Sequence, residues 1–214
     1  MKLLISILLA FTTSFVAYAT DVNAKTVFTD GHFVTDVDYY VETPFDSLSM
    51  VLDELYEGMQ NRPTQDLKWA WKGLGRNKSV DGDLNLRENG VKFNPSTNEY
   101  ILNLLVGMTS DENPSQFQVE GKLLDSKRPS MHLVQLAITK KIKILNDANF
   151  VVTATPYGRN RSKLHVKGSI KFGWFFNMFF TTSRYASILE WRIDGFTKNV
   201  KERAEEKMVS NQEK

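Results

Sequence analysis

Apolar and polar positions along the chain first predict a strand and then a helix. From His32 to Glu42, apolar or aromatic side chains alternate with polar ones that include three acids, the period-two pattern of a half-buried strand. Between Phe45 and Met59 the apolar residues recur at helical spacing. Thr43 and Pro44 precede them as a candidate N-cap and a first-turn residue. We therefore expect a strand followed directly by a helix.

The segment from 67 to 172 is predicted to be almost entirely strand. Trp69 and Trp71 alternate with lysines, and the longest strand is expected over 131–144. Turn signals separate the strands, among them Asn89-Gly90 and the stretch 125–129. A strand from Lys163 to Phe172 has apolar residues on one face and lysines with a histidine on the other. Short connections between consecutive strands indicate an antiparallel meander.

A long amphipathic helix is predicted from Ser183 to about Lys207. In helical projection one stripe is apolar and consists of Tyr185, Leu189, Ile193, Phe196 and Val200. Arg192 falls within this stripe, and Gly195 lies at its edge. Because a glycine in mid-helix costs about 1 kcal/mol relative to alanine, we expect another group to approach the helix closely there.

Residues 1–19 have the pattern of a secretory signal peptide: a charged start at Lys2, an apolar core and the small-residue triplet Ala17-Tyr18-Ala19. A second candidate cleavage site follows Ala24. The alternative, a membrane anchor, is disfavoured because the apolar core is shorter than the ~20 residues that a spanning helix needs. The sequence contains no cysteine. A disulfide-free exported protein favours the bacterial periplasm over a eukaryotic secretory compartment.

Length and charge limit the remaining possibilities. Residues 20–214 suffice for a single domain with one hydrophobic core. Removal of residues 1–19 takes away one of the 27 basic residues and none of the 25 acids, which leaves a net charge of about +1. Such a chain lacks the basic surface that neutralises phosphates, so we expect no nucleic-acid partner.

The order strand, helix, antiparallel meander and long C-terminal helix resembles the helix-grip fold of the START-like superfamily, which includes the polyketide cyclases and the Bet v 1-like proteins. The resemblance covers about Phe33 to Lys207 and is most specific at the end, where a strand leads through Gly173-Trp174-Phe175-Phe176 into the amphipathic helix. It implies an α+β domain whose curved antiparallel sheet wraps around the C-terminal helix. It also implies a cavity for a hydrophobic, lipid-like ligand. This sequence differs from most members of the superfamily in carrying a secretory signal, so a cytosolic role does not follow from the resemblance.

Candidate ligand-binding residues follow from the helix and from the tryptophans. Arg192 would bind a carboxylate or phosphate of a ligand. Alternatively, its side chain would extend past its neighbours toward solvent or pair with an internal acid. Gly195 would leave room for the ligand. The aromatic wall of a pocket is predicted from Tyr185, Phe196, Trp69 and Trp71, although ordinary core packing explains these four equally well.

Histidines and aromatic residues supply the other candidates. His132 begins one face of its predicted strand and would point either into the cavity or toward a structural partner. The three histidines of the chain lie on separate segments, so neither a metal site nor a cofactor is predicted. No catalytic set is visible at a recognisable spacing. Trp174, Phe175, Phe176 and Phe179 form either a membrane-contacting portal or a buried turn that plugs the sheet.

Three functional hypotheses remain open. The first is a secreted or periplasmic protein that binds a hydrophobic, lipid-like ligand between sheet and C-terminal helix, with peripheral membrane contact. The second is an enzyme of the cyclase or hydrolase type that uses the same cavity through one acid or base. The third is an envelope interaction module with a filled core, in which the aromatic cluster docks onto a partner protein.

Overall fold

The computed structural model of the 214-residue chain describes residues 24–74, 84–108, 112–174 and 182–212. Its described part forms one antiparallel sheet in the order β1-β2-β8-β7-β6-β5-β4-β3. The strands are β1 (Lys25–Thr29), β2 (His32–Val41), β3 (Leu84–Asn94), β4 (Glu99–Met108), β5 (Ser115–Arg128), β6 (Met131–Ile138), β7 (Leu145–Pro156) and β8 (Ser162–Phe172). The helices are α2 (Phe45–Gln60), α3 (Pro63–Asp66) and α6 (Thr182–Gln212).

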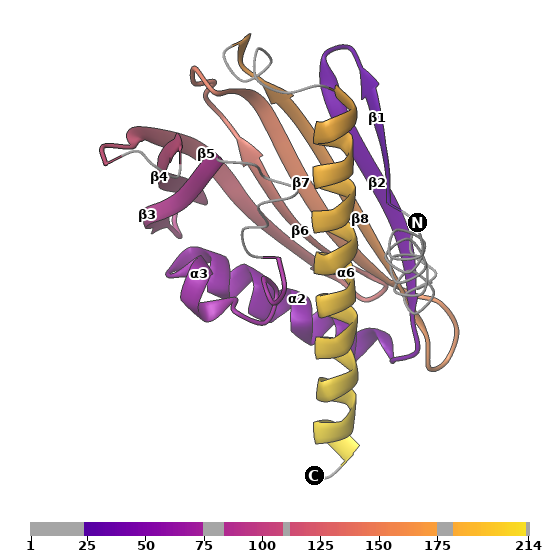
Figure 1. The fold of residues 1–214 in the computed structure, drawn as a ribbon. Helices are drawn as coiled ribbons and strands as arrows, with labels where there is room; N and C mark the ends of the chain where they lie inside the picture. Colours follow the sequence, from indigo (N-terminus) through magenta and orange to yellow (C-terminus); the bar gives the residue numbers. More distant parts are fainter. Residues whose placement is uncertain (1–23, 75–83, 109–111, 175–181, 213–214) are drawn as a thin grey trace, which may run out of the picture.

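The sheet curves, and α6 runs across its concave side while α2 crosses one end (Figure 1). Strands β3 to β8 form the expected meander, and the hairpin of β1 and β2 joins it through β8. This is the predicted α+β helix-grip arrangement, which is thereby confirmed.

The hydrophobic core lies between the concave face of the sheet and the two longer helices. Directly paired residues on neighbouring strands point to the same face, so the pairs Val37–Val166 and Val152–Val166 place all three valines on the concave side. From the helices the core receives Leu48, Val51, Leu52, Leu55, Ile193, Phe196, Val200 and Ala204. Burial of these apolar stripes holds the helices against the sheet.

The segment after α3 differs from its predicted strand. Trp71 N–H donates to the carbonyl of Leu67 (3.2 Å), and Leu74 N–H donates to the carbonyl of Trp71 (3.0 Å), so the chain coils in consecutive turns. Leu67 is fully buried, and its side chain packs onto Gly58 of α2, where an added Cβ would overlap it. Anchoring of Leu67 against α2 explains why the alternation of the tryptophans does not form a strand.

Several predicted boundaries also differ. Asn89 and Gly90 lie in a bulge of β3, where the register shifts between Glu88 and Val91, and Gly90 adopts a φ of 107°. The turn predicted over 125–129 comes later, because β5 continues to Arg128, and the strand predicted over 131–144 ends at Ile138. The short strand β1 had no clear signal in the sequence.

The start of α2 differs as well. Pro44 is the N-cap, and its carbonyl accepts bonds from the N–H groups of Ser47 (3.1 Å) and Leu48 (3.4 Å). Thr43 is fully buried, and its Oγ1 has no hydrogen-bond partner, so the predicted side-chain cap is not formed. Within the described ranges, no helix combines the length and the apolar character that a bilayer crossing requires.

Candidate functional site

Arg192 and Gly195 both contact the segment of residues 67–74, which lies against α6. Arg192 Nη1 donates to the carbonyl of Leu74 (3.0 Å). A Cβ added at Gly195 would overlap Leu74 Cδ2, so only glycine lets this side chain rest on the helix. The predicted close approach at Gly195 is therefore real, and the group that approaches is Leu74. Whether either residue also binds a ligand stays a prediction.

Phe196 and the two tryptophans lie at the same junction. The rings of Trp71 and Phe196 are 6.1 Å apart, and Phe196 meets Phe150 of β7 edge-on at 5.5 Å. Trp71 also donates its indole N–H to the carbonyl of Pro63 (3.2 Å), while Trp69 packs against the core as a half-buried side chain. One further residue, Asn199, fastens this junction by donating to the carbonyls of Ala70 and Lys72, both at 2.9 Å.

Tyr185 lies apart from this junction, near the start of α6. Its ring contacts those of Phe33 (5.4 Å) and Phe172 (4.3 Å) in a second apolar cluster. Burial raises the pKa of the Tyr185 phenol above its usual value. The seven predicted ligand-binding residues thus occupy three places: the α6 junction, the Tyr185 cluster and the site of His132 described below.

The predicted portal begins at this same end of the sheet. Trp174 is 69% exposed. Phe28 of β1, whose ring centre lies 4.8 Å from that of Phe33, is 50% exposed. Phe175, Phe176 and Phe179 lie outside the described residues. The exposure of Trp174 fits a surface that contacts a membrane or a partner protein, which stays a prediction.

On the concave face of β4 to β7, several apolar side chains that pack against the main core or the Tyr185 cluster are only half-buried. Strand pairing puts them on the same side as the core: Leu104 opposes Phe117, Leu123 opposes Leu136, and Leu136 opposes Phe150. The half-buried members are Leu102, Leu104, Phe117, Leu136, Ile138 and Phe150. We call these six residues the inner apolar surface. Their partial exposure leaves apolar area on an inward-facing surface, where a core would be expected to be closed.

His132 belongs to a polar cluster beneath α2 whose carboxylates are partly exposed. Its side chain is fully buried, its Nδ1 lies 2.8 Å from Ser49 Oγ, and its Nε2 lies 2.7 Å from Asp125 Oδ1. A second carboxylate, Asp53, lies 3.9 Å from the same Nε2 and pairs with Lys127 at 2.7 Å. Ser49 also lines an open surface pocket of about 420 Å³.

Sequence reasoning found His132 but missed its two partners. Asp125 is seven residues away on the adjoining strand, at the position of a predicted turn. Ser49 is 83 residues away on α2, and no spacing rule connects it to the histidine. The other histidines sit elsewhere: His32 pairs with Asp147 (3.1 Å), and His165 with Asp38 (2.8 Å). Among the described residues no group of His, Cys, Asp or Glu could hold a metal ion.

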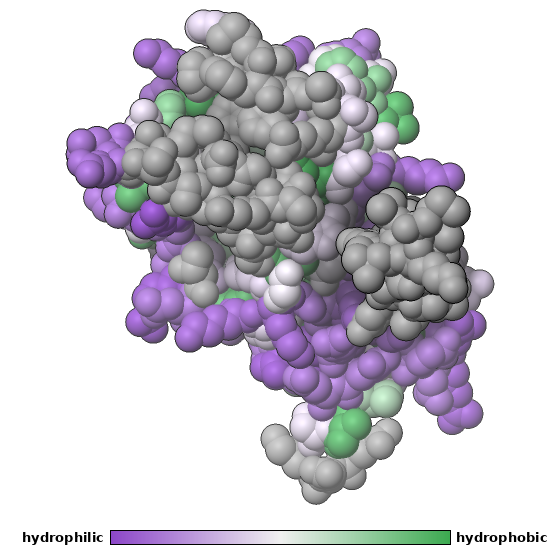
Figure 2. Space-filling view, in the orientation of Figure 1, coloured by the Kyte–Doolittle hydropathy of each residue, from purple (hydrophilic) through white to green (hydrophobic). Residues whose placement is uncertain are grey.

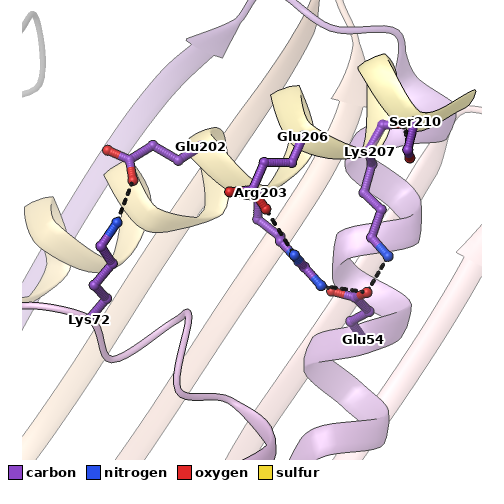
Figure 3. A network of polar contacts seen from close by, with 7 residues as sticks. All are labelled: Glu54, Lys72, Glu202, Arg203, Glu206, Lys207 and Ser210. Carbon is purple, nitrogen blue, oxygen red and sulfur yellow. Dashed lines mark hydrogen bonds and ion pairs between the residues drawn. The ribbon is translucent and has the colours of Figure 1, made fainter. Parts of the chain in front are cut away.

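The C-terminal half of α6 is fixed to α2 by an ion-pair network (Figure 3). Glu54 of α2 accepts hydrogen bonds from Arg203 Nε (2.9 Å) and Nη2 (3.2 Å), and Lys207 Nζ also contacts it. Arg203 reaches Glu206 as well (2.8 Å). The surface around this half of α6 is mostly hydrophilic (Figure 2). This face therefore differs from the inner apolar surface and is structural in character.

No family model matches the chain, and no curated protein matches it in sequence. Solved structures that it resembles include the Zhui aromatase/cyclase from Streptomyces sp. R1128, with 11% identity, a TM-score of 0.44, and coverage of 81% of this chain and 94% of that one. A START superfamily protein from Mycobacterium smegmatis matches with 9% identity, a TM-score of 0.45, and coverage of 82% and 99%.

Norcoclaurine synthase from Thalictrum flavum, in complex with dopamine and hydroxybenzaldehyde, matches with 14% identity, a TM-score of 0.40, and coverage of 83% and 89%. The expected START-like resemblance thus appears among solved structures. Likeness at this level assigns no activity to this chain, so its function is argued from its own residues.

Proposed function

We propose that this protein binds a hydrophobic small molecule against the inner apolar surface. One observation supports this above the others: six apolar side chains on the concave face of β4 to β7 keep part of their area accessible. Removal of such area from water contributes roughly 25 cal/mol per Å², and this is the driving force available to an apolar ligand.

The neighbourhood of this surface supports the same proposal. Phe196 of α6 bounds it through Phe150 (5.5 Å between rings), and Leu189 of α6 packs in the same cluster as Leu104 and Phe117. A ligand lying there would have the sheet on one side and α6 on the other. Pockets for small molecules are mostly apolar with few polar groups, which matches these side chains.

The proposal extends to a lipid-like ligand and to the bacterial periplasm. A lipid-like ligand is extended and apolar. The inner apolar surface has the same two properties, because it spans the four strands β4 to β7. The location rests on the signal-peptide pattern of residues 1–19 and on the absence of cysteine from a chain expected to be exported.

The proposal is tested by comparing two variants of neighbouring leucines on β4. Leu104 points to the concave face and Leu105 to the opposite face, since side chains alternate along a strand. We expect Leu104→Trp to fill the surface and to weaken binding of the fluorescent probe N-phenyl-1-naphthylamine by at least about tenfold, or 1.4 kcal/mol. Leu105→Trp, the matched control, should bind as the unchanged protein does.

Native mass spectrometry of protein purified from its own host provides the second measurement. An adduct that is extracted into organic solvent would identify the ligand class. A clean spectrum, together with probe binding that neither tryptophan alters, would contradict the proposal.

A further inference from the structure

The cluster beneath α2 brings together the three side chains of a nucleophilic relay, each from a different element. Ser49 comes from α2, His132 from β6 and Asp125 from β5. The distances of 2.8 Å from Ser49 Oγ to His132 Nδ1 and 2.7 Å from His132 Nε2 to Asp125 Oδ1 are those of two consecutive hydrogen bonds. The inner apolar surface includes none of these residues, so this site is independent of the proposed ligand-binding function.

The chemistry of the three groups fixes the direction of the relay when the imidazole is neutral. A carboxylate only accepts hydrogen bonds, so Nε2 carries the hydrogen that is donated to Asp125. Nδ1 then has a lone pair and accepts from the Ser49 hydroxyl. This arrangement places a base on the serine proton and a carboxylate behind that base, as activation of a serine nucleophile requires.

A surface pocket of about 420 Å³ borders Ser49, which is 2% exposed. A pocket of this volume is large enough for a small ligand. Its apolar lining is formed by Phe45, Met50 and Pro129, and its charged lining by Asp46, Lys127 and Arg128. Lys127 is already paired with Asp53 (2.7 Å), so Arg128 is the lining cation that would stabilise a negative charge on a substrate oxygen.

We propose that Ser49, His132 and Asp125 hydrolyse a small carboxylic ester bound in this pocket. Ser49 Oγ attacks the carbonyl carbon while its proton moves to His132 Nδ1, and Asp125 stabilises the resulting imidazolium. When the tetrahedral intermediate collapses, the C–O bond to the alcohol breaks, and the alcohol leaves with the proton from Nδ1. Water then attacks the acyl-serine and gives its proton to Nδ1, which returns it to Ser49 as the carboxylic acid departs. The balance is ester plus water to acid plus alcohol.

A fluorophosphonate probe tests the nucleophile in the unaltered protein, because it phosphonylates only activated serines. We expect one adduct, located at Ser49 by peptide mass mapping. Hydrolysis of 4-nitrophenyl acetate is expected to fall at least about a hundredfold in Ser49→Ala and in His132→Gln. Ser47→Ala, a buried serine on the same helix, is the matched control and should keep full activity.

Asp125 is a positioning residue in this scheme, and Asp125→Asn keeps its shape. We expect this variant to lower kcat while KM and the thermal midpoint stay the same, which a purely structural role would not produce. Absence of an adduct at Ser49 in folded protein would overturn the proposal. Hydrolysis by Ser49→Ala at the unaltered rate would overturn it too.

Discussion

Gly195 determines how closely α6 approaches the segment 67–74. With any larger residue, a side-chain atom would occupy the space of Leu74 Cδ2. We expect Gly195→Leu to cost roughly 1–3 kcal/mol in the free energy of unfolding, because overpacking displaces both elements. Leu74→Ala should cost about 2–5 kcal/mol through the cavity it leaves. Urea unfolding of each variant measures both values.

The double variant separates direct packing from indirect effects. If Leu74 and Gly195 share one space, a leucine at 195 fills the cavity left at 74, and the double variant is more stable than the sum of the single changes predicts. Lys198→Leu, at an exposed position of α6, is the control and should not compensate for Leu74→Ala. If the losses of unfolding free energy in Leu74→Ala and Gly195→Leu simply add in the double variant, residues 74 and 195 are not coupled.

At the scale of elements, α2 and α6 are joined by the carboxylate of Glu54 (Figure 3). Burial taken alone raises the pKa of Glu54, but the hydrogen bonds and charges of Arg203 and Lys207 outweigh it, so its pKa lies below 4.5. A lowered pKa means that the ionised form stabilises the fold. This contribution is complete above the unfolded pKa and is lost as the pH falls through the folded pKa.

We therefore expect Glu54→Gln to lose about 1 kcal/mol of unfolding free energy near neutral pH. The difference from the unaltered protein should shrink as the pH is lowered from about 6 to about 3, since the glutamic acid then becomes neutral as well. Urea unfolding at several pH values measures this. Glu57→Gln, an exposed position on the same helix, should show no such dependence. A deficit independent of pH would refute the electrostatic explanation.

Elements with a regular period were predictable, and those fixed by distant contacts were not. The apolar stripe of α6 and the alternation of β8 depend only on neighbouring residues, which is why both elements were predicted. The bounds of β8 were close, whereas α6 continues beyond its predicted end near Lys207 to Gln212. The turns at 67–73 depend on Leu67 packing against Gly58. The strand β1 depends on pairing with β2 and on Thr26 N–H donating to Glu190 of α6 (2.7 Å). Neither set of contacts can be predicted from the local pattern of apolar and polar residues.

At the scale of the whole molecule, the same distinction holds for the candidate sites. Helical projection singled out Arg192 and Gly195 as exceptions to an apolar stripe, yet it could not show that residues 67–74 would reach them. The relay of Ser49, Asp125 and His132 forms only when α2 crosses the hairpin of β5 and β6. Such a site is a product of the tertiary fold, which no spacing along the chain reveals.

The fold also discriminates between the two candidate cleavage sites of the expected signal peptide. Ala24 is buried, with 6% exposure, and its N–H donates to Asp194 Oδ1 of α6 (3.0 Å). Cleavage after Ala24 would remove this bond, whereas cleavage after Ala19 preserves it. Either cleavage keeps all of β1, which begins at Lys25. We therefore expect the exported protein to begin at Thr20, which intact-mass measurement of periplasmic material would show. A mature chain beginning at Lys25 would contradict the anchoring role of Ala24, and recovery of the protein only with Met1 would contradict its export.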